Sequence, residues 1–409
     1  MSALKYWIWL AELSGVPLSI RHKLLLHFGS PEQIYYAERE TLSLVEGLQP
    51  KQIDALCNQS LTKTEAILAD CQRLGISVIS FQDSLYPARL RNIFEPPLLL
   101  YAKGNMPVLD EEVPIAVVGT RRASPYGIRS AEKISCGLAQ QGAVVVSGLA
   151  SGIDAAAHCG ALRGRGLTVA VLGCGVDVVY PSENERLYLD IAATGVLLSE
   201  YPPGTKALGE HFPVRNRIIS GLSLAVLVAE APERSGAIIT AHLALEQGRD
   251  VFAVPGAIDA PGSRGCNRLI AEGAGLVADS ADILENYAAQ YPHKLHIKGR
   301  VSPQRFVYAG KKRETERDTA PENRTEDAEA KELPPDEVLS EEALAALPPD
   351  ELLLLKTMQD GADRLTDDLI EETELPAGRV LAALTGLEIA GYLVRGSGNR
   401  FRICVKIKE

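Results

Sequence analysis

The sequence predicts an α/β protein whose main part is a doubly wound parallel sheet, with a small all-α domain before it and a winged helix after it. Two observations predict the sheet: apolar strand-like runs recur through residues 112–282, and helical patterns separate them. Strands that are apolar throughout and alternate with helices are typical of parallel sheets covered on both faces. A third observation, an acidic stretch with few apolar residues before residue 350, separates the C-terminal domain.

Residues 1–80 are expected to form the all-α domain. Apolar residues recur there at helical spacing, and GISVISF is the longest strand-like run. Two stretches, LSGVPLSIRHKLLLHFG and LVEGLQPKQIDAL, each place a glycine and a short turn before a new helix. Two interpretations fit these stretches equally well. One is a SAM-like or helix-hairpin-helix-like unit, which grips a nucleic-acid backbone, and the other is a small helical bundle whose glycines only turn the chain.

Residues 81–290 are expected to form the sheet domain. Its strand-like runs alternate with helical patterns that often close on a glycine, as helices commonly do. Ligands of doubly wound sheets bind along the carboxyl ends of the strands, so a site is expected there. The runs are residues 115–120, 143–149, 167–175, 196–201, 224–230 and 250–256.

The stretch VVSGLASGIDAAAH, at the end of the second run, has the features of an anion-binding turn. Its glycines allow positive φ, and the following helix offers unpaired N–H groups and the positive end of its dipole. A dinucleotide site would need a G-x-G-x-x-G turn, but Gly173-x-Gly175 has Val178 at the third glycine position. Small residues and arginines follow several strands instead. This pattern favours a ligand with a chain of phosphates over a single nucleotide.

Seven motifs between residues 119 and 274 resemble, in order, those of the DNA-processing protein A (DprA/Smf) family. They are GTRRASPYG, VVSGLASGIDAAAH, VAVLGCGVDVVYPSEN, LLSEYPPG, HFPVRNRIISGLS, ERSGAIITAHLALEQGRDVFAVPG and GCNRLIAEGA. The resemblance implies a Rossmann-like domain in a cytoplasmic, non-enzymatic protein that binds single-stranded DNA without sequence preference. It also implies protection of incoming DNA, loading of a RecA-type recombinase during natural transformation, and a homodimer.

The matching motifs carry over a set of DNA-binding candidates. Arginine forks suit phosphate oxygens, small residues supply backbone N–H groups, and an aromatic ring can stack on bases. Phe212 is preferred for stacking over Tyr180 and Tyr201, while Ser182 and Glu183 in YPSEN offer no positive charge. The candidates are Arg121, Arg122, Ser147, Gly148, Ser151, Gly152, Phe212, Arg215, Asn216, Arg217, Ser235 and Gly236.

A nucleotide-cleaving enzyme of the phosphoribohydrolase type is the alternative. Glu200 and Glu230, each at a strand end, could act as an acid/base pair, and Asp154 and His158 could complete a triad with a nearby serine. Fold relatives of that type carry a glutamate on the helix after the glycine-rich turn, where this chain has residues 240–243, Thr-Ala-His-Leu. The binding function is therefore favoured, and no catalytic residue is assigned.

The C-terminal part divides into a linker and a winged helix. Residues 291–348 are expected to be an acidic disordered linker, and residues 349–409 to form three helices and a hairpin with its tip at residues 396–399. The second helix of the helix-turn-helix pair offers only Arg379 as a basic residue, and acidic residues precede it. This pattern favours a protein-contact or regulatory role over the reading of duplex DNA.

Composition sets the remaining limits. The net charge of the 409 residues is −11, but residues 314–342 hold twelve acids and three bases, which leaves about −2 for the rest and does not exclude a nucleic-acid partner. The seven cysteines form no CxxC pair, which argues against zinc and disulfides and fits the cytoplasm. No metal, cofactor, signal peptide or membrane span is expected.

Overall fold

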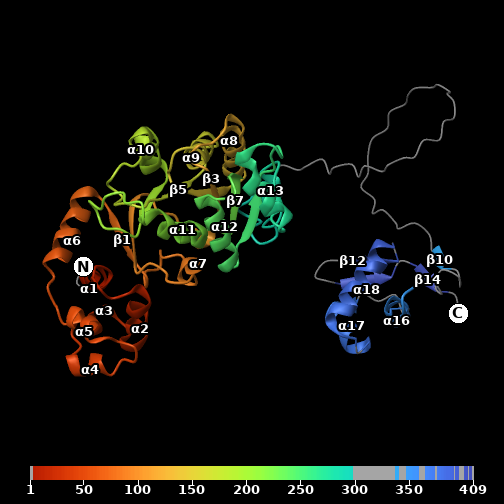
Figure 1. Cartoon of the computed structure of the whole chain (residues 1–409), viewed down its shortest axis with the longest axis horizontal. Coiled ribbons are helices and arrows are strands. Elements are labelled where there is room, and N and C mark those ends of the chain that lie inside the picture. The colour runs from red at the N-terminus through yellow and green to blue at the C-terminus, as the bar shows by residue number, and fades with distance from the viewer. Residues whose placement is uncertain are drawn as a thin grey trace. The chain divides into compact units, whose positions relative to one another are not determined.

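The computed structural model describes residues 3–297, 337–339, 347–358, 364–373, 375–390, 392–395, 400–403 and 405–407. The chain divides into two compact units, Met1–Tyr308 and Ala309–Glu409, which are considered separately (Figure 1). No helix among the described residues is long and apolar enough to cross a membrane.

The first unit opens with six helices that pack beside one edge of the sheet (Figure 1). Trp7 and Leu10 of the first helix are buried in one cluster with Leu99 and Tyr101 of strand β2. Because this core is shared, the helices are an extension of the sheet domain rather than a separate body. The helices are α1 (Leu4–Ala11), α2 (Leu18–Phe28), α3 (Pro31–Tyr35), α4 (Arg39–Ser43), α5 (Pro50–Leu56) and α6 (Thr62–Leu74).

The sheet has nine strands in the order β1-β2-β6-β5-β4-β3-β7-β8-β9. Strands β3 to β9 pair in parallel, as predicted from their apolar runs, whereas β2 pairs antiparallel with both β1 and β6. The expected boundary at residue 80 therefore needs correction, because β1 lies before it and belongs to the sheet. The bounds are β1 (Ser77–Ser80), β2 (Leu99–Gly104), β3 (Val113–Gly119), β4 (Ala143–Ser147), β5 (Thr168–Val171), β6 (Val196–Ser199), β7 (Ala225–Glu230), β8 (Asp250–Ala253) and β9 (Gly275–Leu276).

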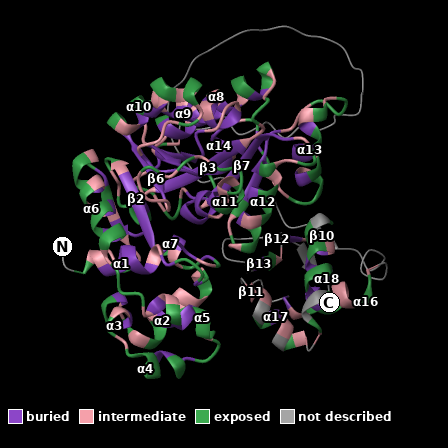
Figure 2. Ribbon diagram, turned by 60° about the vertical axis from the view of Figure 1, so that its left-hand side comes forward, coloured by how far each residue is buried: buried purple, intermediate pink, exposed green. Residues whose placement is uncertain are grey.

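Both faces of the sheet are covered, so its central strands β3 to β7 are almost entirely buried (Figure 2). Val144 and Val146 point to one face and Val145 to the other, the alternation that a pleated strand imposes. The Val144 face packs against α7 (Ala88–Arg91), α11 (His211–Leu222), α12 (Gly236–Glu246) and α13 (Arg264–Ala271). The opposite face packs against α8 (Pro125–Gln140), α9 (Ile153–Arg163), α10 (Glu185–Thr194) and α14 (Ala281–Leu284).

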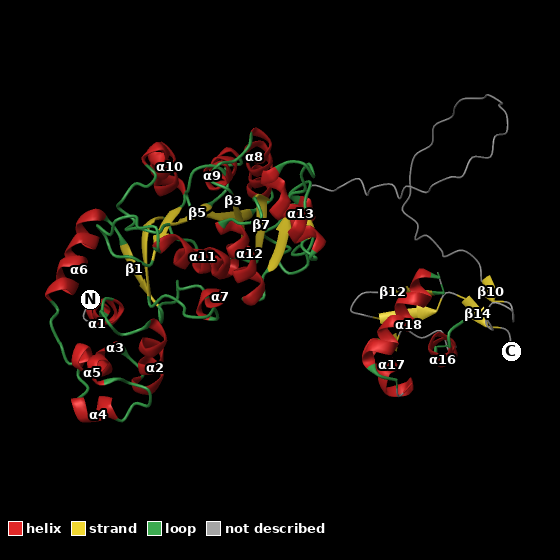
Figure 3. Ribbon diagram, viewed as in Figure 1, coloured by secondary structure: helices red, strands yellow, loops and turns green. Residues whose placement is uncertain are grey.

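The second unit has the helices and hairpin of a winged helix, as predicted (Figure 3). Helices α16 (Pro349–Thr357), α17 (Thr366–Thr373) and α18 (Ala377–Ile389) enclose a core that includes Leu354 and Leu384. A three-stranded sheet joins β11 (Arg364–Leu365), β13 (Arg400–Ile403) and β12 (Leu393–Arg395). Among the described residues of α18, Arg379 is the basic one, and it pairs with Asp350. Its guanidinium donates to both carboxylate oxygens, at 2.8 and 2.6 Å.

Most of the expected linker, and the hairpin tip at residues 396–399, lie outside the described residues. Two of the described pieces of the linker range, residues 291–297 and 337–339, contact folded parts of the chain. Leu295 is buried against the sheet domain, and the Lys294 ammonium lies 2.5 Å from the Glu112 carboxylate. Strand β10 (Glu337–Leu339) pairs in parallel with β14 (Val405–Ile407), so the expected linker boundaries are corrected at both ends.

Candidate single-stranded DNA site

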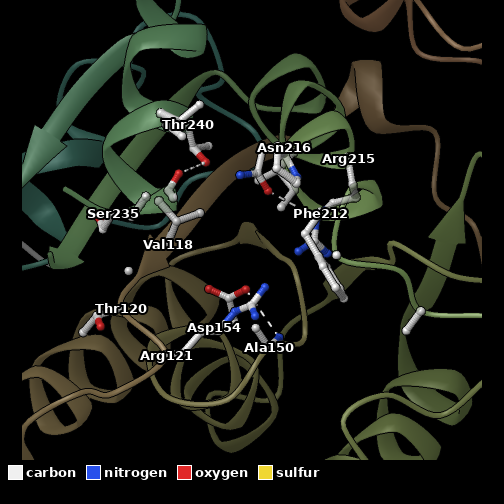
Figure 4. Close-up of a pocket in the computed structure, with 18 of the residues that line it drawn as sticks. Val118, Thr120, Arg121, Ala150, Asp154, Phe212, Arg215, Asn216, Ser235 and Thr240 are labelled. Atoms are coloured by element: carbon white, nitrogen blue, oxygen red, sulfur yellow. Dashed lines mark hydrogen bonds between the residues drawn. The ribbon is translucent and has the colours of Figure 1, made fainter.

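A pocket of about 410 Å³ opens at the carboxyl end of β3, where the loops before α8, α9, α11 and α12 meet. Figure 4 shows Arg121 and Asp154 on one side of it, with Phe212, Arg215 and Asn216 of α11 across from them. This is the edge that the sequence predicted. The pocket brings together six predicted residues: Arg121, Phe212, Arg215, Asn216, Ser235 and Gly236.

The turn before α9 packs directly on the loop after β3. Gly152 has φ +80°, and a Cβ there would lie 2.5 Å from the Thr120 carbonyl oxygen and 2.7 Å from that of Arg121. The Ile153 N–H donates to the same Thr120 oxygen at 3.2 Å. Gly152 is therefore required both by its backbone conformation and by this close approach, and the turn sets the position of Arg121.

The turn before α9 was predicted to bind phosphate. Several of its polar groups instead form hydrogen bonds within the protein. Ser147 is buried and its hydroxyl donates to the Val117 carbonyl at 2.6 Å. A Cβ on Gly148 would lie within 2.7 Å of the Arg215 guanidinium, so the glycine makes room for that side chain. The Ala150 N–H donates to the Asp154 carboxylate at 3.4 Å. Ser147 and Gly148 therefore support the site from behind.

Arg215 forms part of the pocket wall as a buried side chain. Its Nη1 donates to the carbonyl oxygens of Gly148, at 2.8 Å, and Val171. Burial lowers the pKa of Arg215, and the charge of Asp154 opposes that change. Burial likewise raises the pKa of Asp154, with Arg215 opposing it. These opposite charges offset one another, so Arg215 contributes mainly by holding two loops together.

Aromatic rings and a cation gather at the mouth of the pocket. The Arg121 guanidinium lies 4.8 Å from the centroid of the Phe212 ring, and the Tyr180 ring lies 5.5 Å from it at an interplanar angle of 30°. Tyr180 is 43% exposed, whereas Tyr201 stacks on His211 and does not line the pocket. Phe212 and Tyr180 therefore present ring surface beside an exposed positive charge, which is the arrangement that nucleobases and phosphates use.

The N-terminus of α12 lines the pocket on another side. Ser235 caps this helix, because its hydroxyl accepts from the Ile238 N–H at 3.4 Å. A Cβ on Gly236 would meet no atom within 4 Å, so the protein itself does not require glycine there. The positive end of the helix dipole and its first N–H groups thus face the open pocket, as an anion site requires.

Six of the twelve candidates lie outside the pocket lining: Ser147, Gly148 and Gly152, described above, and also Arg122, Ser151 and Arg217. Arg122 is exposed beside Arg121, and its N–H donates to the Thr120 hydroxyl at 3.2 Å. The Ser151 hydroxyl donates to Glu183 at 2.5 Å. Arg217 is directed away from the pocket, with its Nη2 2.6 Å from the Glu200 carboxylate and both side chains nearly buried. Thr120 and Thr240 also line the pocket; they lie inside the matched motifs but were not among the predicted site residues.

The residues of the alternative enzyme do not meet. Strands β6 and β7, which lead to Glu200 and Glu230, are separated by three strands. At about 4.8 Å per strand they lie about 19 Å apart, whereas paired glycosidase carboxylates lie about 5 to 10 Å apart. Glu200 pairs with Arg217, and Glu230 accepts from the Ser124 N–H at 2.7 Å.

The imagined triad is also absent from this edge. The Thr168 hydroxyl donates to the Val145 carbonyl, so His158 Nδ1 donates to Thr168, 2.7 Å away, and not to Asp154. His158 is fully buried, and burial lowers its pKa to about 3. Across the described residues there is no group of three or more histidine, cysteine or acidic side chains that could hold a metal ion.

Two family models match the chain. Residues 77–288 match the family described as DNA recombination-mediator protein A, and residues 338–399 match the DprA winged helix domain. The chain belongs to the DNA recombination-mediator protein A family. The resemblance that the seven motifs indicate is thereby confirmed, and the DprA winged helix match coincides with the second structural unit.

Curated and solved members of this DprA family also match the chain. The Smf protein of Synechocystis sp. is 40% identical over 288 residues, which are 69% of this chain and 72% of that protein. The DNA processing protein DprA of Streptococcus pneumoniae is 50% identical over 208 residues, which are 51% of this chain and 73% of that protein. The X-ray structure of DNA processing protein A from Streptococcus pneumoniae has a TM-score of 0.62 and 39% identity, covering 69% of this chain and 97% of that chain.

Proposed function

We propose that the chain is a cytoplasmic, sequence-independent single-stranded DNA-binding protein that acts as a recombination mediator and not as an enzyme. The single observation that carries the proposal is the pocket itself. It joins Arg121, the Phe212 ring and the N-terminus of α12 at one edge of the sheet.

Each part of the pocket matches a part of a polynucleotide. Arg121 and Arg122 are exposed and suit phosphate oxygens, and the start of α12 at Gly236 suits another. Phe212 and Tyr180 offer rings on which any base can stack, and this kind of contact carries little base preference. Arg215, Ser147, Gly148 and Gly152 act as positioning residues, since the protein's own carbonyls, side chains and loops occupy them.

The test is fluorescence anisotropy of labelled single-stranded and duplex oligonucleotides over a salt series. Preference for the single strand is expected, with the logarithm of affinity falling by about 0.7 per logarithmic unit of salt for each phosphate neutralised. Arg121→Ala should lower both the affinity and this slope, and Phe212→Leu should lower affinity by roughly 1 to 3 kcal/mol. Arg163→Ala is the matched control, because Arg163 is exposed at the opposite end of α9. Equal affinity of wild type and Arg121→Ala would contradict the proposal.

Two further parts rest on family membership. The protein is proposed to protect incoming DNA and load a RecA-type recombinase during natural transformation, and to act as a homodimer. Faster assembly of recombinase filaments on DNA coated with a single-strand-binding protein would support loading, and light scattering would measure the oligomeric state. No acceleration at saturating protein would refute the mediator role.

The enzyme alternative has its own test. A phosphoribohydrolase would release free base from a nucleoside monophosphate, and Glu230→Gln would abolish that release. We expect no release from wild type, because Glu230 accepts from a backbone N–H and lies far from Glu200. Base release that depends on Glu230 would overturn the proposed function.

A further inference from the structure

A second hollow, of about 540 Å³, lies on the outer side of α8 near the same edge of the sheet. Its floor is apolar and includes Pro255 and Val277, which follow the carboxyl ends of β8 and β9. Its outer wall is one face of α8, on which Tyr126, Arg129, Ser130 and Lys133 recur at helical spacing. Among the described residues, none that lines the hollow is acidic.

Both cations of this α8 face are exposed. Within the described part of the chain, neither Arg129 nor Lys133 forms an ion pair or a side-chain hydrogen bond. By contrast, Glu132 of the same helix pairs with Arg163 of α9 at 3.1 Å. The hollow is therefore a locally positive surface in a protein whose net charge is negative.

Tyr126 is held in place at the top of the hollow. Its hydroxyl donates to the Pro255 carbonyl at 2.6 Å, and the residue is 44% exposed. A ring that is fixed at one end and open to solvent can stack on a base with little loss of conformational freedom. Arg129 and Lys133 follow it by one and two helical turns.

A short segment of chain connects the candidate site to the helix that walls the hollow. Arg121 and Arg122 precede Ser124, which caps α8 by accepting from the Gly127 N–H at 3.1 Å. Glu230, which ends β7 at this edge, is buried and accepts from the Ser124 N–H, so it does not present its carboxylate to solvent. Positive side chains thus follow one another from the pocket mouth to the α8 face.

Resting on the proposed function, we propose that a single strand of DNA leaving the pocket passes over Arg122 and runs along the Tyr126–Arg129–Lys133 face of α8. Arg129 and Lys133 are about 6 Å apart along the helix axis, close to the spacing of successive phosphates in an extended strand. The two cations bind phosphates and Tyr126 stacks on one base, so this face lengthens the binding site beyond the pocket.

The test uses the full chain and two lengths of oligothymidylate, about 4 and about 16 nucleotides, which bracket the usual site size of one small binding domain. For the double variant Arg129→Ala/Lys133→Ala, binding of the long strand should weaken on the order of tenfold and lose about 1.4 of its salt slope, for two phosphates. Binding of the short strand should be unchanged. Tyr126→Ala should weaken binding of the long strand more than Tyr126→Phe does, because Phe keeps the ring and loses only the hydrogen bond to the Pro255 carbonyl.

The controls separate the two proposals. Arg163→Ala should bind both lengths like wild type, and circular dichroism should show unchanged melting for Arg163→Ala and for the double variant, because these side chains are on the surface. If wild type binds both lengths and the double variant binds the long strand with unchanged affinity, the α8 path is wrong and the proposed function still holds. A wild type that binds neither length overturns both. Equal weakening for both lengths also overturns the α8 path, because the cations would then belong to the pocket.

Discussion

Gly152→Ala tests whether the turn before α9 fixes the loop that carries Arg121. The new Cβ would lie 2.5 Å from the Thr120 carbonyl oxygen and 2.7 Å from that of Arg121, and both obstacles are backbone atoms that cannot rotate away. Overpacking of this kind costs about 1 to 3 kcal/mol, and a non-glycine residue at φ +80° and ψ −123° adds about 1 to 3 kcal/mol. We therefore expect a loss of about 2 to 6 kcal/mol in the free energy of unfolding.

The assay is urea unfolding followed by circular dichroism, with Gly236→Ala as the matched control. Gly236 also begins a helix at this edge, but its Cβ would meet no atom within 4 Å, so its substitution should leave stability unchanged or slightly raised. Gly152→Ala should also weaken single-stranded DNA binding, because Arg121 moves with the loop. A Gly152→Ala protein within about 0.5 kcal/mol of wild type would refute the interpretation of this turn.

Three further predictions follow from buried and open groups. Gly236→Ala should weaken DNA binding without loss of stability, because its methyl group occupies the space of a bound phosphate; unchanged affinity would place the strand elsewhere. Arg215→Met should lower the free energy of unfolding in urea by about 3 to 5 kcal/mol, because Asp154 loses its compensating charge. Arg121→Ala should change the free energy of unfolding by less than about 0.5 kcal/mol. Equal stabilities of the two variants would refute that distinction. The pKa of His158 is lowered to about 3, so the unfolded chain binds a proton that the folded chain does not, and stability falls as pH drops below about 6.5. Between pH 7.5 and 5 His158 accounts for about 2 kcal/mol of this fall, so the fall should be smaller by that amount in His158→Gln, as urea unfolding at both pH values can check.

Local pattern was enough to predict the main architecture. The six central strands follow apolar runs such as residues 143–149, and their parallel pairing follows from the helices between them. Strand β2, which contains most of the run LLLYAKG, is not among the six strand-like runs that the sequence analysis predicted. Its antiparallel pairing with β6 joins residues about a hundred positions apart, which no local period reveals.

The site was predicted as an edge but not as a set of contacts. Spacing along the strands correctly put Arg121, Phe212 and Gly236 at one pocket. It could not show that the Arg215 guanidinium passes behind Gly148, 67 residues away in the chain. Arg121 is exposed to a ligand, whereas Arg215 is buried and supports the site. Only long-range packing distinguishes these two roles, because the residue type is arginine in both cases.

The shared core of α1 and β2 has a practical consequence for dissecting this protein by deletion. Removing residues 1–80 would take away β1 and leave β2 as an unprotected edge with Leu99 and Tyr101 uncovered. Exposed strand edges with apolar side chains promote self-association. A shortened protein that fails to bind DNA would thus report the damaged sheet, and point substitutions on the outer surface of α2 or α5 are the sounder way to ask what these helices touch.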